Sequence, residues 1–149
     1  MIRSSDFDKA IELIGKSSRV LLVSHTRPDG DACGCIVALC EVLGTLGKKA
    51  EAVFLSEVPR WYNFLFDKKQ AILGEDISVE KLKEAGFDLI ILVDVNSRSQ
   101  LPVFTEVLEE RKAAVLVIDH HETADGLGDV ELIDTSAAAT GLIVFDLFK

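Results

Sequence analysis

Apolar residues follow two different spacings along the chain, and the two spacings alternate. Short apolar runs at 20–23, 89–93 and 115–118 contain β-branched residues and no polar interruption, which is typical of strands buried on both faces. Elsewhere apolar residues recur every three or four positions, as on one face of a helix. The pattern predicts helices at 5–16, 31–47, 79–85, 104–111 and at the end of the chain, and strands at 20–23, 50–55, 89–94, 115–119 and 130–133.

Strands that alternate with helices are typical of the α/β class. Because the central strands are apolar throughout, both faces of the sheet need a cover of helices. We therefore expect an open parallel sheet of about five strands with helices on both faces, a Rossmann-like arrangement. A length of 149 residues suffices for one domain, 1–149, with a sizeable core. The sequence stops inside the last predicted helix without a C-cap signal, so we expect a longer natural protein.

Composition narrows the classes of function. Hydrophobic residues make up 48% and charged residues 28% of the chain, which excludes a disordered, collagen-like or disulfide-rich protein. The formal net charge of −9 opposes binding to duplex nucleic acid or to an anionic membrane. The start has no apolar signal segment, and no apolar run approaches the ~20 residues of a membrane span. The three cysteines lack the spacing of a zinc site, so we expect reduced thiols and a cytoplasmic protein.

Candidate metal ligands follow three of the predicted strands. His25 comes two residues after the first strand, Asp94 directly follows the run 89–93, and Asp119 to His121 follow the run 115–118. Because the carboxyl ends of parallel strands open into one crevice, these side chains are expected to converge. A single His or Asp at a strand end is more often a cap or turn residue. Three such ends at one edge instead predict a metal site, where a cation offsets the cost of burying Asp94.

The loop after His25 adds two carboxylates, Asp29 and Asp31. Pro28 stiffens this turn and Gly30 permits a tight fold, so His25 and both carboxylates can face one point. In the alternative interpretation, Asp29 or Asp31 merely caps the following helix and interacts favourably with its dipole. The neighbouring histidine favours the metal site.

Aromatic residues gather in the least regular segment, 56–74. Trp61, Tyr62, Phe64 and Phe66 lie close together after Pro59. Neighbouring aromatic residues in one short helix usually cover a core, and we expect that role here. The alternative is that they stack on a nucleobase.

Three segments together resemble the motifs of the DHH phosphoesterase family. They are His25–Gly34, with the sequence HTRPDGDACG, then Val93–Asp94, and then Asp119–His121, with the sequence DHH. The segment Ala139–Asp146 resembles the helix that follows in the nano-RNase branch. The family also includes RecJ-type exonucleases, exopolyphosphatases, cyclic-dinucleotide phosphodiesterases and family II pyrophosphatases. The resemblance covers nearly the whole chain and implies that this is the N-terminal DHH domain.

The resemblance implies a site for two manganese ions, with Mg²⁺ or Co²⁺ as substitutes. His25, Asp29 and Asp94 would hold one ion. Asp31, Asp94 and His120 would hold the other, so that Asp94 bridges the pair. Mixed histidine and carboxylate ligands agree with this choice of metal.

The remaining roles implied by the resemblance concern the substrate. His121 would contact the scissile phosphate, and Asp119 would orient the two histidines. Gln100 stands where many nano-RNase relatives have Arg, which leaves Arg98 or Arg27 as phosphate contacts. The fourth motif of the family, which supplies another Asp to the second ion, and the C-terminal substrate-binding domain are expected beyond the last residue of this chain.

We therefore expect a metal-dependent phosphoesterase that hydrolyses short oligonucleotides or 3′-phosphoadenosine 5′-phosphate (pAp) with water as the nucleophile. Exopolyphosphatase or cyclic-dinucleotide phosphodiesterase activity is the alternative within this class. A non-catalytic DHH-like interaction module is the alternative outside it. A nucleotide-binding flavodoxin-like or Rossmann domain ranks last, because no GxGxxG follows the first strand. The chain alone is expected to be weakly active or inactive, and homodimerisation is left open.

Overall fold

The computed structural model describes residues 1–149 and contains a six-stranded sheet in which all paired strands are parallel. The strands are β1 (Arg19–Val23), β2 (Lys49–Phe54), β3 (Ala71–Ile72), β4 (Leu89–Val93), β5 (Ala114–Asp119) and β6 (Val130–Ile133). The α-helices are α1 (Ser4–Lys16), α2 (Gly30–Thr45), α3 (Val79–Glu84), α4 (Phe104–Glu109) and α5 (Thr140–Phe148), and two short 3₁₀ helices are η1 (Arg60–Leu65) and η2 (Arg98–Gln100). The α/β class and the open parallel sheet are confirmed.

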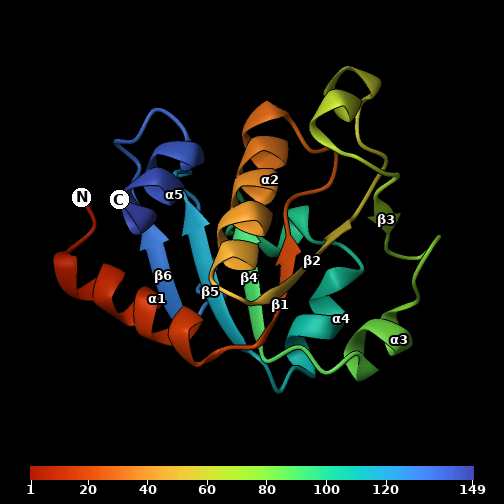
Figure 1. Cartoon of the computed structure of the whole chain (residues 1–149), viewed down its shortest axis with the longest axis horizontal. Helices are drawn as coiled ribbons and strands as arrows, with labels where there is room; N and C mark the ends of the chain where they lie inside the picture. Colours follow the sequence, from red (N-terminus) through yellow and green to blue (C-terminus); the bar gives the residue numbers. More distant parts are fainter.

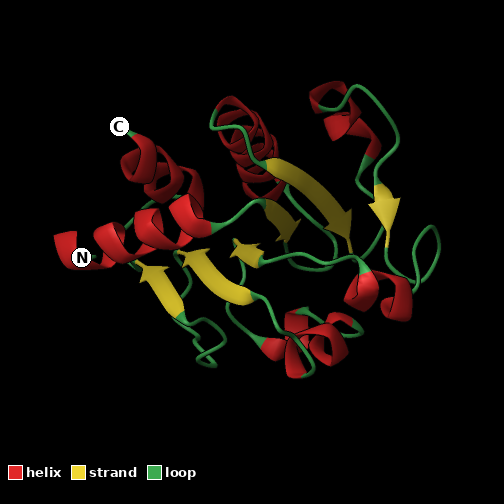
Figure 2. Ribbon diagram, turned by 60° about the horizontal axis from the view of Figure 1, so that its bottom comes forward, coloured by secondary structure: helices red, strands yellow, loops and turns green.

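Alternate residues of each central strand enter two separate cores. In β1, Leu22 packs with α1, α2 and α5, whereas its neighbour Leu21 packs with α3 and α4. The same alternation continues in β4 and β5, because successive side chains of a strand point to opposite faces. Figure 2 shows α1, α2 and α5 on one side of the sheet and α3 and α4 on the other. The fully apolar strands predicted from the sequence therefore lie in a three-layer fold.

The strand order is β3-β2-β1-β4-β5-β6. Strands β1, β2 and β3 thus follow one another toward one edge of the sheet. The chain then returns to the centre, and β4, β5 and β6 follow one another toward the other edge. A topological switch point lies between β1 and β4. The loops after these two strands lead to helices on opposite faces of the sheet, which leaves a crevice where ligands bind in folds of this class. In Figure 1 these carboxyl ends are at the top of the sheet, beside the upper end of α2.

The sheet has six strands rather than the expected five. The sixth strand, β3, has two residues and pairs with the end of β2, so it is too short to leave a periodic pattern. The last helix begins at Thr140. No helix is both long enough and apolar enough to cross a membrane.

The aromatic segment forms the 3₁₀ helix η1, and the expectation that its residues cover the core is half wrong. Tyr62 and Phe66 pack against the core, as expected. Trp61 and Phe64 instead remain 71% and 82% exposed. In a 3₁₀ helix, side chains three positions apart eclipse one another, so the two exposed rings share one face.

Candidate metal centre

Three neighbouring strands and the start of α2 bring the predicted ligands to one edge of the sheet. His25 lies in the loop after β1, Asp94 directly follows β4, and Asp119 is the last residue of β5. Because β1, β4 and β5 are adjacent and parallel, these positions lie together at the switch point. The crossover from β1 into α2 then adds Asp29, the N-cap of that helix.

Asp94 is at the centre of the cluster and is 1% exposed. Its backbone has φ of 60°, in the left-handed region that non-glycine residues seldom occupy. The Asp94 amide donates to the carbonyl of Ile118, 2.9 Å away, and the hydroxyl of Thr140 donates to Oδ1 at 2.7 Å. Strained backbone of this kind persists where the surroundings hold it, and it is common at functional sites.

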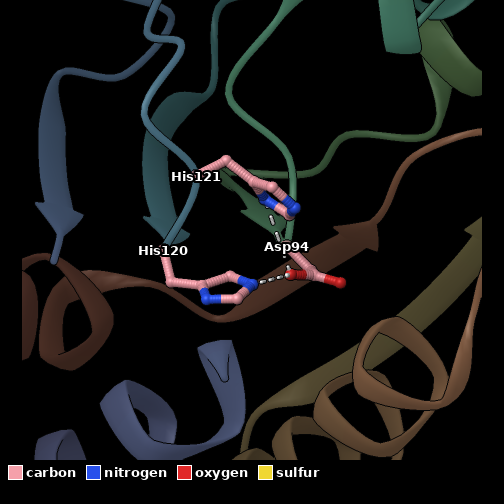
Figure 3. Close-up of side chains that lie close together, drawn as sticks. All are labelled: Asp94, His120 and His121. Carbon is pink, nitrogen blue, oxygen red and sulfur yellow. Dashed lines mark ion pairs between the residues drawn. The ribbon is translucent and has the colours of Figure 1, made fainter. Parts of the chain in front are cut away.

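Three imidazoles surround the Asp94 carboxylate. His25 Nε2 lies 3.6 Å from Oδ2, whereas His120 Nε2 and His121 Nδ1 lie 3.8 Å and 3.9 Å from Oδ1. Figure 3 shows the rings of His120 and His121 converging on the carboxylate from the end of β5. These separations are too long for hydrogen bonds. The two Nε2 separations fit ligands that share an ion with Asp94, since two atoms each ~2.1 Å from a metal can be up to ~4.2 Å apart.

Backbone contacts fix which nitrogen of His25 and of His120 faces the Asp94 carboxylate. His25 Nδ1 donates to the carbonyl of Thr26 at 2.8 Å, and His120 Nδ1 donates to the carbonyl of Ala137 at 3.1 Å. In a neutral imidazole the proton on Nδ1 leaves a lone pair on Nε2. Both lone pairs therefore face Asp94, and a cation between them, a proton or a metal ion, removes the repulsion. This donor set fits a divalent metal, and such Nδ1 contacts are typical of metal-ligating histidines.

The charges of the cluster shift two pKa values in opposite directions. The Asp94 carboxylate raises the pKa of His25 above its ordinary value, although burial acts in the opposite direction. Burial raises the pKa of Asp94, but His25 and the Thr140 hydroxyl outweigh it and hold this pKa below the usual range. The metal-free site therefore favours an imidazolium beside a carboxylate.

The candidate ligand atoms form two groups that share Asp94. One group is His25, Asp29 and Asp94, and the other is Asp94, His120 and His121. Each oxygen of Asp94 faces a different group, because Oδ2 lies toward His25 and Oδ1 toward the two other histidines. Asp29 also caps α2, accepting from the amides of Asp31 and Ala32 at 3.0 Å each. The helix-cap interpretation of Asp29 is therefore confirmed, and the cap leaves Asp29 within the first candidate group.

Asp31 lies at the margin of the second group. Its Oδ2 is 4.0 Å from His120 Nε2, but both of its oxygens accept from the start of α5. The Thr140 amide donates to Oδ2 at 2.7 Å, and the Gly141 amide donates to Oδ1 at 3.0 Å. Oδ1 also accepts from the Cys35 thiol at 3.5 Å, whereas Oδ2 keeps a second lone-pair direction. The carboxylate can therefore still bind a metal ion through Oδ2.

Asp119 supports both histidines that follow it. Its carboxylate is fully buried, and Oδ1 accepts from the His120 amide and from His121 Nδ1, each at 2.8 Å. Burial lowers the pKa of His121, but the Asp119 carboxylate outweighs it and raises this pKa above the ordinary value. His121, 44% exposed, therefore directs its Nδ1 proton at the Asp119 carboxylate, and its Nε2 has no hydrogen-bond partner in the chain.

The two predicted phosphate contacts have different surroundings. Arg98 lies 3.5 Å from the Glu109 carboxylate on α4, so its charge is already paired. Arg27 is exposed in the loop between β1 and α2, with φ of 52°. Its amide donates to Ser56 Oγ at 2.7 Å, which ties this loop to the segment leading into η1.

Two buried polar residues escaped prediction. Thr140 is fully buried and contacts both Asp94 and Asp31. Asn96 is 1% exposed, and its Nδ2 donates to the carbonyl of His121 at 3.2 Å. Asn96 could have been found from its position, because it is a polar residue two positions after Asp94 at the end of a buried strand. Thr140 could have been found from the sequence Ala-Thr-Gly at the start of a predicted helix.

A switch-point cluster of histidines and carboxylates on an open parallel sheet defines the class, an α/β domain with a candidate divalent-metal centre. The chain belongs to the DHH family, because the description "DHH family, N-terminal domain" matches residues 19–149. The family predicted from the three motifs is therefore confirmed.

Curated relatives are longer than this chain. It is 33% identical over 128 residues to the bifunctional oligoribonuclease and PAP phosphatase NrnA of Thermus thermophilus, covering 86% of this chain and 36% of that protein. It is 27% identical over 150 residues to NrnA of Mycoplasma pneumoniae, covering 97% and 44% respectively. The chain thus spans less than half the length of these relatives.

Solved structures share the fold. An exopolyphosphatase-related protein from Bacteroides fragilis superposes with a TM-score of 0.90 at 20% identity, covering 99% of this chain and 44% of that one. Exonuclease RecJ bound to manganese superposes with a TM-score of 0.58 at 19% identity, covering 96% and 35%.

Proposed function

We propose that this chain is the catalytic domain of a metal-dependent phosphoesterase that acts on short oligonucleotides or pAp. The observation that carries the proposal is that Nε2 of His25 and Nε2 of His120 each face one oxygen of buried Asp94, while their Nδ1 atoms contact backbone carbonyls. Without a cation this arrangement places acceptors against an acceptor, which is costly to bury. The NrnA relatives support the substrate class.

The proposed ligands come from the two groups around Asp94, except that His121 is kept for the substrate and Asp31 lies beside the second ion. His25, Asp29 and Asp94 hold one divalent ion, and Asp94 with His120 holds the second, with Asp31 beside it. Such ions, when bound, acidify a coordinated water and offset charge on the attacked phosphoryl group. The nitrogen and oxygen donors suit Mn²⁺, with Mg²⁺ or Co²⁺ as substitutes, and RecJ, which shares the fold, was solved with manganese.

The chain's own residues then orient the substrate. His121 presents Nε2 to a phosphoryl oxygen while Asp119 holds its other nitrogen. The buried Asp119 carboxylate fixes the ring and stabilises its protonated form. Asn96 holds the backbone of His121 in place. Exposed Arg27 meets phosphate charge beside the site, a role we do not extend to paired Arg98.

We further propose that a C-terminal substrate-binding domain completes the active protein, since the curated relatives are more than twice as long as the matched region.

Cys33, Cys35 and Cys40 are free thiols on α2. Burial raises the pKa of the Cys33 thiol to about 11, so it stays protonated and unreactive. Reduced thiols support a cytoplasmic location.

The first experiment is a calorimetric titration of this chain with Mn²⁺. Two bound ions, both lost in Asp94→Ala, would support the bridged pair. Asp146→Ala, on the exposed side of α5, is the matched control and is expected to bind as the unmodified chain does. Hydrolysis of pAp and of short oligonucleotides is then measured on a longer protein. Absence of specific metal binding would overturn the proposal and favour a non-catalytic interaction module.

A further inference from the structure

Trp61 and Phe64 are two exposed aromatic residues of η1, the 3₁₀ helix that packs beside the start of α2. They are three positions apart in η1 and share one face of this 3₁₀ helix. On its other side, Tyr62 and Leu65, also three apart, pack against the core. Side chains 71% and 82% exposed on an otherwise anchored helix are typical of a surface that binds a ligand or partner.

Two aromatic contacts hold η1 rigidly in place. The ring of Tyr62 comes within 3.3 Å of the point where a Cβ on Gly30 would lie. Gly30 is the residue between Asp29 and Asp31, so this contact fixes η1 against the part of the chain that carries two candidate ligands. At the other end, the rings of Phe66 and Phe54 meet edge to face, with centroids 5.7 Å apart. Figure 1 shows η1 beside the upper end of α2, where that helix begins.

Unpaired positive charge lies next to the aromatic pair. Arg60 begins η1, and Arg27 lies in the loop that Ser56 ties to the segment before η1. Both side chains are exposed and neither forms an ion pair. The chain's other arginines each lie within reach of a carboxylate: Arg3, Arg19, Arg98 and Arg111. In a chain of net charge −9, unpaired guanidinium groups beside exposed rings fit a ligand with both a phosphate and a flat ring.

We propose that Trp61 and Phe64 stack on a nucleobase of the substrate whose phosphate is bound at the metal centre, while Arg27 and Arg60 meet a neighbouring phosphate. This inference rests on the proposed function and assigns the residues that bind the base of its substrate. Base-bearing phosphate esters are preferred over pyrophosphate or polyphosphate, which offer nothing to stack. Every nucleobase has a π-face, so this stacking platform, formed by Trp61 and Phe64, is expected to tolerate different bases.

Trp61 is the chain's single tryptophan, so its fluorescence reports on the platform directly. We would titrate the Mg²⁺-loaded chain with pAp and, separately, with pyrophosphate. The expected result is a saturable change in Trp61 emission with pAp and none with pyrophosphate. Phe64→Ala is expected to weaken pAp binding about tenfold, the loss of roughly one base–aromatic stack. Phe145→Ala, which removes another exposed ring on α5, is the control and leaves binding unchanged.

The outcomes separate this inference from the proposed function. If calorimetry shows metal-dependent pAp binding while Trp61 emission and the Phe64→Ala affinity stay unchanged, the platform is wrong and the phosphoesterase proposal stands. If metal fails to bind but adenosine still quenches Trp61, the platform stands and the phosphoesterase proposal fails. If Trp61 responds only to protein concentration, in step with dimers seen by sedimentation, the surface is an interface between copies and the platform is overturned.

Discussion

At the scale of single residues, Asp94 explains most of the site. A carboxylate 1% exposed is expensive to bury alone. Three imidazoles and one hydroxyl surround it, but the imidazole nitrogens remain beyond hydrogen-bond distance. The Thr140 hydroxyl is the one close side-chain contact, at 2.7 Å. It fixes the carboxylate plane so that each oxygen faces a different group of candidate ligands.

Thr140→Val is therefore expected to weaken Mn²⁺ binding about tenfold, since loss of a partner that orients a ligand typically has this cost. Thr140→Ser, which keeps the hydroxyl, is expected to retain the affinity. Calorimetry on both variants measures the effect. Equal affinity in the Val and Ser variants would show that the hydroxyl does not orient Asp94.

The raised pKa of His25 predicts opposite pH trends for stability and metal binding. Because this pKa lies above the ordinary value of 6.5, its stabilisation of the metal-free fold is present below pH 6.5 and is lost as pH rises through the raised pKa. Mn²⁺ affinity is expected to rise over the same range, because metal and proton compete for the Nε2 lone pair. Urea unfolding in a chelator and Mn²⁺ titration, both from about pH 6 to 8, check the two trends. His25→Gln is expected to flatten both, and parallel trends would contradict the assignment.

The residues that could be predicted are those next to a local pattern. His25, Asp94 and Asp119 each follow an apolar run, and their convergence follows from a parallel sheet. The contacts of Thr140 with Asp31 and Asp94 join positions 109 and 46 residues apart. No periodicity or spacing encodes such pairs, so they emerged only from the packing of α5 against the sheet edge.

At the scale of elements, α5 begins without a side-chain cap of its own. Its N-cap is Ala139, and no side chain next to it in sequence accepts from its first amides. Asp31 of α2 accepts from Thr140 and Gly141 instead, so one helix caps another. The carboxylate at the metal centre thereby also holds the last helix in place, near the positive end of its dipole.

Asp31→Ala is expected to destabilise the metal-free chain by about 1 kcal/mol, the usual cost of losing a cap. For a domain of this size that corresponds to a fall of ~2–4 °C in the midpoint of thermal unfolding. Melting curves in a chelator isolate this effect from metal binding. Asp146→Ala, on an exposed position of α5, should leave the midpoint unchanged. An equal loss in both variants would refute the cross-helix cap.

Element prediction succeeded where a segment was long and periodic. The helices and the five longer strands lie close to their expected ranges. The two residues of β3 could not be predicted, because they pair with β2 through only two register positions. The role of the η1 aromatics was mistaken for a similar reason, since their exposure depends on which side of a short 3₁₀ helix meets α2.

At the scale of the whole molecule, the topology converts scattered residues into one site. The sequence predicts a parallel sheet but not the order of its strands, because adjacency depends on which way each crossover turns. The order places β1 beside β4, and the switch between them brings together candidate ligands from positions 25 to 121. A bound ion would link strand ends from both halves of the sheet, so metal binding is expected to stabilise the entire fold.

That linkage gives a quantitative expectation for thermal unfolding. A ligand present at 100 times its dissociation constant stabilises the folded state by ~2.7 kcal/mol, which for a domain of this size is a rise of ~5–10 °C in the melting midpoint. Saturating Mn²⁺ should produce this rise in the unmodified chain and in Asp146→Ala, but not in Asp94→Ala. The comparison uses the increment caused by metal, so a different starting stability of the Asp94 variant does not matter. An equal rise in the melting midpoint of Asp94→Ala would show that the ion binds elsewhere on the acidic surface. The switch point would then not be the metal centre.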